Sequence, residues 1–522
     1  MKKTGDTIRF NGKEFILGQP LGIGGEGTVF EIAIPAQNGI VAKAAVKIIE
    51  TKKKAPTEIV LIRRQINDLI DVRKRSREKA KTNRSVSLSE FLVLPQAILE
   101  DDVGYVMSLV QGFEPLTNYF NIPKGSEEQM EWQQKYDLRR RYRVIAYLFE
   151  RLEKIHIEGL VFSDLSPNNI LVSQKNDSSL KFIDTDNLRT KSNPFSNVLG
   201  TPGFIAPELL RKHERPDVLT EEEAKNIEDS HLLSEESDVY SAAIIAFMLL
   251  TLNHPFKGVK AIGENTTPED EIAAEMGQMD YILKPGTDNY CEGNIFVDKF
   301  DSITTPEIRD LFARTFIDGK DNPLHRPTAN EFKNEFQRAS RLIVKCPHCG
   351  EESLYSTYVG DNGKLKSNSI CINPECNQRI DEQLLFTVYA SATDKASATD
   401  KSVEEAILGS EAANHTIEPI VLSKIVLQEK EEQTLYFPDI DISGDLKKDD
   451  RACRLLINGG TAIIKICQQP KDATIEIVSR KDKPAIPVIS QAAFPYENDY
   501  ILFQNIRTRY GIINVIGEIQ KV

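Results

Sequence analysis

The sequence lacks a long hydrophobic segment and an excess of basic residues. Its longest apolar run, Tyr240–Leu252, is too short to span a bilayer, so we expect a buried core helix there and no membrane anchor. No apolar run follows the first six residues, and we therefore expect no secretory signal peptide. The formal net charge of −13 argues against a general nucleic-acid binder.

Cysteine is scarce as well, with seven residues in a chain of 522. Because so few cysteines in so long a chain do not suggest a disulfide scaffold, we place the protein in the cytoplasm. The length is too great for one hydrophobic core and predicts two to four domains. Hydrophobic residues make up 40% and charged residues 27% of the sequence, which is typical of a soluble globular protein.

A polar loop between two apolar segments contains Asp164 and, five residues later, Asn169. This spacing resembles the catalytic loop of protein kinases, in which an aspartate faces the acceptor hydroxyl and an asparagine holds magnesium. Phe162 and Ser163 stand where that family has His and Arg, and Ser166 stands in place of a lysine. A polar turn before a strand would account for the spacing equally well, so the other motifs must decide.

A glycine-rich turn near the N-terminus carries Gly22, Gly24 and Gly27, with Val29 two residues further on. Glycines let a backbone approach phosphate oxygens closely. Dinucleotide-binding turns share this pattern, but a helix follows the glycines there. Here residues 28–34 are β-branched and alternate, which predicts a strand and favours a kinase-type hairpin.

Two charged residues follow the glycine turn. Lys47 lies within an apolar strand, as does the phosphate-holding lysine of protein kinases; a strand-edge lysine with a solvated head is the alternative. Pro56 opens a long helical pattern, and Glu58 is the candidate carboxylate that pairs with Lys47. A first-turn glutamate stabilised by the helix dipole would explain Glu58 as well. The basic stretch 73–81 is a solvated helix end or a docking patch.

Strand-like segments at 91–99 and 104–110 and an amphipathic helix at 134–157 lead to the catalytic loop. By alignment to the family, Met107 lines the back of an adenine pocket. Leu109 lies in the hinge, where backbone groups would contact the adenine edge. A core methionine is the alternative for Met107.

Beyond the loop, Asp184 takes the position of the metal-binding aspartate in the family's Asp-Phe-Gly motif, while Thr185 and Asp186 replace Phe and Gly. Residues 200–208 resemble the end of an activation segment, and they include Thr201 where Ser/Thr kinases carry a substrate-facing threonine. The resemblance also implies a structural ion pair between Arg326 and Glu208 and a helix opened at Asp238.

At least six motifs thus occur in order, and residues 8 to about 340 resemble a eukaryotic-type (Hanks-type) protein kinase domain. The nearest resemblance is to cytoplasmic bacterial Ser/Thr kinases with a Ser-Asp-Leu-x-Pro-x-Asn loop. It implies an α+β bilobal kinase fold over residues 1–340, with an N-lobe of about 1–110 and a C-lobe of about 111–340.

The resemblance also implies the chemistry. The glycine loop would cover ATP, and Lys47 would contact its α- and β-phosphates. Asp184 and Asn169 would hold Mg²⁺ or Mn²⁺, and Asp164 would accept the proton of a protein hydroxyl. Partners implied are protein substrates, a cognate phosphatase and von Willebrand A-like domain proteins.

Two other functions fit part of the pattern. An ATP-binding pseudokinase scaffold would explain the departures around the catalytic loop and the metal strand. A small-molecule kinase of the aminoglycoside type also tolerates loss of the loop lysine, but the 200–208 segment, Asp238 and Arg326 are typical of protein kinases.

Four cysteines form a separate pattern in residues 341–388. Cys346, Cys349, Cys371 and Cys376 resemble the two knuckles of a zinc ribbon, in which thiolates on tight turns converge on a structural Zn²⁺. The metal would supply the folding energy of so small a module. Chance cysteine pairs or a redox Cys-x-x-Cys are the alternatives, and His348 is not expected to be a ligand.

The remaining sequence predicts a linker and an all-β domain. A direct repeat in residues 391–401 has low complexity, and we expect a flexible linker over 389–414. Short strand-like segments separated by turns predict a small β-sandwich or barrel over 415–522. Its sequence does not indicate a function.

Overall fold

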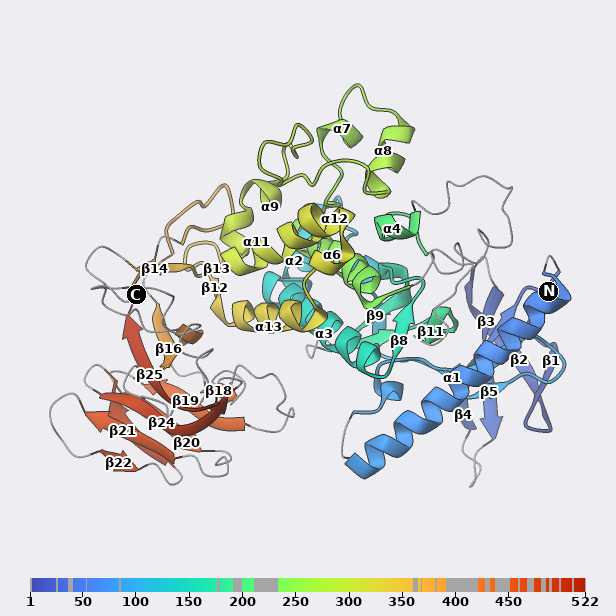
Figure 1. Ribbon diagram of the computed structural model, residues 1–522, viewed down its shortest axis with the longest axis horizontal. Coiled ribbons are helices and arrows are strands. Elements are labelled where there is room, and N and C mark those ends of the chain that lie inside the picture. Colours follow the sequence, from blue (N-terminus) through green and yellow to red (C-terminus); the bar gives the residue numbers. More distant parts are fainter. Residues whose placement is uncertain are drawn as a thin grey trace. The chain divides into compact units, whose positions relative to one another are not determined.

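The structure is a computed structural model (Figure 1). It describes residues 2–24, 27–35, 41–52, 54–83, 86–175, 179–190, 200–210, 233–359, 365–367, 369–380, 383–390, 421–427, 432–436, 451–458, 461–466, 474–479, 485–487, 491–496, 499–508 and 511–521. Backbone contacts divide the chain into two compact units. One comprises residues 1–298 and 309–333, and the other comprises residues 299–308 and 334–522.

The first unit begins with an antiparallel sheet of six strands in the order β1-β2-β3-β4-β6-β5. Its strands are β1 (Thr7–Phe10), β2 (Lys13–Ile23), β3 (Gly27–Pro35), β4 (Val41–Ile49), β5 (Ala97–Ile98) and β6 (Gly104–Ser108). The hairpin β2–β3 agrees with the predicted strand after the glycine turn. The predicted strand 91–99 is wrong over most of its length, because a 3₁₀ turn ends at Glu90, Leu92 forms only an isolated bridge with Phe182, and the one strand in this stretch is β5.

A long helix, α1 (Pro56–Asn83), packs on one face of this sheet. Ile66 and Ile70 of α1 contact a cluster that contains Ala45, Tyr105 and Met107. Val46, the neighbour of Ala45 on β4, belongs to a different cluster on the opposite face, as the two-residue period of a strand requires. Lys47 therefore shares the α1 face of the sheet with Ala45.

Helices dominate the rest of the first unit. The predicted helix 134–157 is two helices, α2 (Ser126–Lys135) and α3 (Leu138–Ile157), because Asp137 interrupts it and caps α3 by accepting a hydrogen bond from the backbone N–H of Arg140. The buried helix α6 (Glu235–Thr251) confirms the expected core helix and packs against α3. Shorter helices along the chain are α4 (Pro207–Leu210), α7 (Val259–Ile262), α8 (Pro268–Glu275), α9 (Ile295–Asp298), α10 (Phe300–Ile303), α11 (Pro306–Ala313), α12 (Gly319–Asp321) and α13 (Ala329–Ala339). No helix in the described part of the chain is long and apolar enough to cross a membrane.

Two small sheets position the polar loops of this unit. The strands β7 (Phe113–Pro115), β9 (Ile170–Ser173) and β10 (Leu180–Phe182) pair in the order β10-β9-β7. The strands β8 (Leu160–Phe162) and β11 (Leu188–Thr190) pair with each other. Because β8 pairs with β11 and β9 pairs with β10, the loop from β8 to β9 must lie beside the loop from β10 to β11.

The second unit is all β over most of its described residues. Its first strands are β12 (Ile343–Lys345), β13 (Glu352–Leu354), β14 (Thr357–Val359) and β15 (Leu365–Ser367). Ten further strands follow: β16 (Leu384–Ala390), β17 (Val421–Leu427), β18 (Glu432–Tyr436), β19 (Arg451–Asn458), β20 (Thr461–Ile466), β21 (Thr474–Ser479), β22 (Ile486–Pro487), β23 (Gln491–Pro495), β24 (Asp499–Thr508) and β25 (Gly511–Lys521). They form one sheet in the order β17-β16-β25-β24-β21-β22 and another in the order β18-β19-β20-β23.

The strand β16 corrects the predicted domain division. It spans the boundary placed between the cysteine module and the linker, yet it pairs with β17 and β25 of the six-stranded sheet. The cysteine module therefore ends before Leu384. The direct repeat in 391–401, and the rest of the predicted linker after Ala390, lie outside the described residues.

Candidate functional site

The two polar loops meet as the strand pairing requires. The backbone N–H of Ile183 donates a hydrogen bond to the carbonyl of Asn169 (2.9 Å), and the N–H of Ser163 donates to the carbonyl of Asn187 (3.1 Å). The loop that contains Asp164 is therefore fixed against the segment that follows Phe182.

Three donors hold the carboxylate of Asp164. The side-chain amide of Asn169 donates to Oδ2 (3.0 Å), while the backbone N–H and the hydroxyl of Thr201 donate to Oδ1 (2.8 and 2.7 Å). The Thr201 hydroxyl also lies 3.2 Å from the hydroxyl of the buried Ser166. Gly200 permits this approach, because its φ is +103° and a Cβ would lie 2.8 Å from the carbonyl oxygen of Ser163.

The ammonium group of Lys47 is buried between two carboxylates. Its Nζ lies 2.8 Å from Asp184 Oδ1 and 2.9 Å from Asp186 Oδ2, and its side chain is 4% exposed. Burial alone would lower the pKa of Lys47, but Asp186 and Asp184 outweigh it and raise the pKa above its ordinary value. Lys47 therefore remains cationic at neutral pH. Asp184 has a left-handed backbone (φ 55°), which is uncommon for a residue other than glycine and is often found at functional sites.

Asp186 has a role that the sequence did not indicate. The hydroxyl of Tyr105 donates to Asp186 Oδ1 (3.0 Å), and Tyr105 lies directly opposite Lys47 in the pairing of β4 with β6. The sequence identified Asp186 as a departure from the family motif that adds negative charge beside the metal position, and it gave no signal for Tyr105.

The structure pairs Glu58 with Lys54 rather than with the predicted partner, Lys47. Glu58 lies in the first turn of α1 and binds Lys54, four residues before it, with Nζ 2.6 Å from Oε1. The helix instead reaches the site through Gln65, whose amide donates to the carbonyl oxygens of Asp186 and Leu188.

The unusual residues of the catalytic loop have hydrogen-bond partners of their own. The buried carboxylate of Asp238 accepts from the backbone N–H of Phe162 (3.1 Å) and from Nε2 of His156 in α3 (2.9 Å). Burial raises the pKa of Asp238, against the opposite effect of His156. The hydroxyl of Ser163 donates to the carbonyl of Asn187 (2.7 Å). The hydroxyl of Thr185 donates to the carbonyl of Val93 (2.8 Å).

The predicted pair of Arg326 and Glu208 is present in the structure. The guanidinium donates two parallel hydrogen bonds to the carboxylate, of 2.8 and 2.7 Å, and the Arg326 side chain is fully buried. This pair fixes the start of α4, directly after the segment that carries Thr201.

Three of the expected nucleotide-binding residues belong to or pack against the hydrophobic cluster on the α1 face of the sheet. Met107 is buried in the same hydrophobic cluster as Tyr105, and Val29 and Leu109 pack against that cluster. In the turn between β2 and β3, the N–H of Gly24 donates to the carbonyl of Gly27 (2.9 Å). A Cβ on Gly27 would collide with the carbonyl oxygen of Ile48, so this position requires glycine. Gly22 pairs with Val29 across the hairpin.

A pocket opens beside the Asp164 carboxylate. It is lined by the catalytic loop, by the segment from Gly200 to Ala206 and by the first turns of α6, including Asp238 and Ser241.

Comparison with known sequences identifies the family. The model of the protein kinase domain matches residues 15–336, which is more than half of the chain. The chain belongs to the protein kinase family. Its first unit is accordingly the bilobal α+β kinase fold, with the six-stranded sheet and α1 forming the N-lobe.

Individual relatives are protein kinases of plants and bacteria. Calcium-dependent protein kinase 4 of Solanum tuberosum is 28% identical over 248 residues, which cover 46% of this chain and 36% of the relative. Calcium-dependent protein kinase 2 of Arabidopsis thaliana is 36% identical over 108 residues (20% and 14%). Serine/threonine-protein kinase PknG of Mycobacterium leprae is 33% identical over 114 residues (21% and 13%). This kinase thus matches well under half the length of these relatives.

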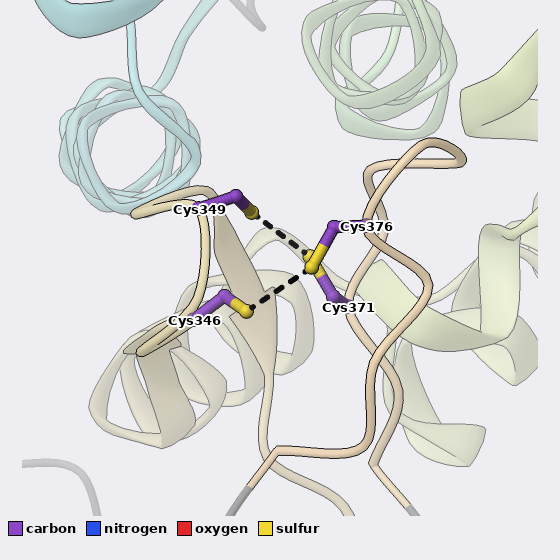
Figure 2. A group of neighbouring side chains, drawn as sticks. All are labelled: Cys346, Cys349, Cys371 and Cys376. Atoms are coloured by element: carbon purple, nitrogen blue, oxygen red, sulfur yellow. Dashed lines mark hydrogen bonds between the residues drawn. The ribbon is translucent and has the colours of Figure 1, made fainter.

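The second unit brings the four predicted cysteines together (Figure 2). Their Sγ atoms all lie within 4.8 Å of one another. Cys346 and Cys349 come from one turn and face Cys371 and Cys376 on another, as Figure 2 shows. The group does not include His348.

The geometry of this cluster fits a metal better than disulfides. The Sγ atoms of Cys346 and Cys376 are 3.7 Å apart, and those of Cys349 and Cys371 are 3.5 Å apart. A disulfide would require about 2.05 Å. Zn–S bonds of about 2.3 Å in a tetrahedral site place the sulfurs about 3.8 Å apart. Four thiols at this spacing could therefore hold a zinc ion.

Proposed function

We propose that this chain is a Ser/Thr protein kinase that transfers the γ-phosphate of ATP to a protein hydroxyl. The observation that carries the proposal is the Asp164 carboxylate, held by Asn169 and Thr201 in the loop adjacent to the ion pair of the buried Lys47 with Asp184. Positioning and charge stabilisation account for most of phosphoryl-transfer catalysis, and this arrangement supplies both.

Each side chain has a distinct role in the proposed reaction. Asp164 orients the acceptor hydroxyl and takes its proton as the oxygen forms a bond to the γ-phosphorus. The bond from that phosphorus to the bridging oxygen breaks, and ADP leaves. Lys47 binds the α- and β-phosphates. Asp184 and Asn169 would hold Mg²⁺ or Mn²⁺, and a metal ion there would supply positive charge to neutralise the phosphates.

The N-lobe supplies the remaining contacts of ATP. The turn with Gly22, Gly24 and Gly27 covers the phosphates, and Val29 packs on the base. Met107 and the hinge residue Leu109 enclose the adenine. The shared hydrophobic cluster of Val29, Met107 and Leu109 supports this assignment.

An ATP-binding scaffold without transferase activity is the second candidate function. The replacement of the loop lysine by Ser166 favours it, because a neutral hydroxyl cannot stabilise charge on the γ-phosphate. A small-molecule kinase is disfavoured by the buried Arg326–Glu208 pair, which fixes a segment typical of kinases that bind peptides.

The deciding experiment uses the purified full chain with labelled ATP and Mg²⁺, with autophosphorylation and phosphate transfer to a generic basic protein as readouts. Asp164→Ala should abolish transfer and leave ATP binding largely intact, because Asp164 contacts the acceptor rather than the nucleotide. If the Asp164→Ala variant transfers phosphate like the unmodified chain, the site assignment is wrong. Nucleotide binding without transfer by the unmodified chain would favour the scaffold.

We further propose that Cys346, Cys349, Cys371 and Cys376 bind one structural Zn²⁺, which stabilises a module too small to fold by apolar burial alone. We also propose a cytoplasmic location, because so few cysteines in so long a chain do not suggest a disulfide scaffold. A cognate phosphatase and von Willebrand A-like proteins are the partners that the family resemblance makes worth testing.

A further inference from the structure

We infer that Asp186 is the carboxylate that positions Lys47, in the role that a helix glutamate has in other protein kinases. This inference rests on the proposed kinase function. It makes Asp186 a positioning residue, since it acts on ATP through Lys47.

The two carboxylates around Lys47 differ in their access to solvent. The side chain of Asp184 is 42% exposed, whereas that of Asp186 is 10% exposed. Asp184 can therefore turn one oxygen to a metal ion. Asp186 is enclosed, and both of its oxygens lie within 3.1 Å of the Lys47 ammonium group. The geometry thus separates a metal-facing carboxylate from a lysine-holding one.

Tyr105 fixes the side chain of Asp186. It is fully buried, it lies opposite Lys47 on the neighbouring strand, and its hydroxyl donates to Asp186 Oδ1 (3.0 Å). A carboxylate that accepts hydrogen bonds from both an ammonium group and a phenol is held in one orientation. The three side chains come from β4, β6 and the segment after β10, which meet only when the kinase unit is folded.

The backbone of Asp186 is anchored separately. Its carbonyl oxygen accepts from Gln65 of α1 and from Nη1 of Arg189 (3.0 Å). The helix α1 therefore contacts the site through the side-chain amide of Gln65, which binds the backbone of the segment that contains Asp184 and Asp186. Glu58, the carboxylate on α1 that the sequence suggested for Lys47, binds Lys54 instead.

A consequence for regulation follows from this arrangement. Where a helix glutamate holds the lysine, displacement of the helix removes the lysine's partner. Here the partner belongs to the same short segment as the metal-binding Asp184, so the ion pair depends on that segment and on Tyr105.

Three variants of the full chain test the inference. Asp186→Asn removes the charge at constant shape, Glu58→Gln makes the same change on α1, and Tyr105→Phe removes only the hydroxyl. The readouts are kcat and KM for ATP, the Kd of a fluorescent ATP analogue (mant-ATP), and the Mg²⁺ concentration that gives half-maximal binding. Thermal unfolding checks that each variant is folded.

We expect Asp186→Asn to lower kcat/KM for ATP and to weaken mant-ATP binding, with a loss in kcat/KM of about 10- to 100-fold, the range for loss of a hydrogen bond to a charged group. The Mg²⁺ requirement should stay within about twofold. Tyr105→Phe should have a smaller effect of a few-fold in the same direction, and Glu58→Gln should stay within about twofold of the unmodified chain.

Other results would overturn the inference. If Glu58→Gln lowers kcat/KM for ATP as much as Asp186→Asn does, then Glu58 of α1, and not Asp186 alone, positions Lys47. A large rise in the Mg²⁺ requirement of Asp186→Asn would make Asp186 a metal ligand. If the unmodified chain binds mant-ATP but transfers no phosphate, the proposed function fails while the binding measurements still decide the role of Asp186. If it binds no nucleotide, both fail.

Discussion

The buried ion pair between Arg326 and Glu208 gives the sharpest prediction about stability. Arg326 donates to Glu208 through both Nη atoms, to the carbonyl of Glu236 through Nη1 (2.9 Å), and to the carbonyl of Gly319 through Nε (2.8 Å). Its guanidinium also lies 4.7 Å from the ring centroid of Tyr240. Arg326→Met removes all of these contacts and leaves Glu208 without its partner in a largely buried position.

The expected loss follows from the burial of the pair. Breaking a buried ion pair by removing one partner costs about 3–5 kcal/mol, against a total stability of about 5–15 kcal/mol for a domain. With a urea m-value of about 3 kcal/mol/M, the unfolding midpoint should fall by about 1–2 M. The exposed pair of Lys74 and Asp71 is the matched control, because both side chains are at least 60% exposed. Lys74→Met should cost about 0.5 kcal/mol or less.

A single fluorophore isolates the relevant transition. Trp132 is the only tryptophan of the chain, and it is buried in α2 of the kinase unit. Its fluorescence in a urea titration therefore reports on this unit rather than on the C-terminal β sheets. Equal midpoints for Arg326→Met and Lys74→Met would refute the reasoning, as would a double variant Arg326→Met/Glu208→Met whose loss equals the sum of the single losses.

The other predictions concern the metals and the activation segment. Asp184→Ala should weaken Mg·ATP binding as well as phosphate transfer, measured by mant-ATP titration at several Mg²⁺ concentrations; unchanged binding would contradict its role as a metal ligand. Metal analysis of protein purified without chelator should find one Zn²⁺ per chain, and Cys376→Ser should release it. Protein that contains no zinc would contradict the assignment of the four cysteines as zinc ligands. Since Ser163 is neutral and cannot hold a phosphate as an arginine does, changing Thr190, Ser192 and Ser196 together to Ala should leave activity within a few-fold. A loss of about a hundredfold in a folded variant would show that another cation has taken over that task. Ser192 and Ser196 lie outside the described residues.

The parts of the site that follow from local chemistry could be predicted from the sequence. The spacing of Asp164 and Asn169 fixes both residues in one loop, and the structure joins them by a hydrogen bond. The pairing of Arg326 with Glu208 could be inferred because the family motifs that contain them are distinctive. The cysteine cluster could be predicted because two closely spaced pairs of cysteines on turns are typical of a structural metal site.

The parts that depend on packing between distant segments could not be predicted. Tyr105 and Asp186 are 81 residues apart in the sequence. The apolar strand that contains Tyr105 gives no indication that its hydroxyl donates a hydrogen bond to Asp186. Glu58 is a candidate from its place in the first turn of a helix, but the packing of α1 decides which of its residues reaches the site, and that residue is Gln65. The pairing of β16 with β25 joins the middle of the chain to its C-terminus and has no local signal.

The unusual residues of the catalytic loop form two groups with different consequences. Where the family motif has histidine, this chain has Phe162, and an imidazole reaches Asp238 from His156 instead. The same carboxylate accepts from the backbone N–H of Phe162, so the start of the loop is held by Asp238. Ser166 is different, because its contact with Thr201 can hold a hydroxyl in place but cannot neutralise phosphate charge. The missing positive charge at Ser166 affects the γ-phosphoryl group during its transfer more than it affects the binding of ATP. It should therefore lower kcat more than ATP affinity, and a slow kinase with ordinary nucleotide binding is the expected phenotype of this sequence.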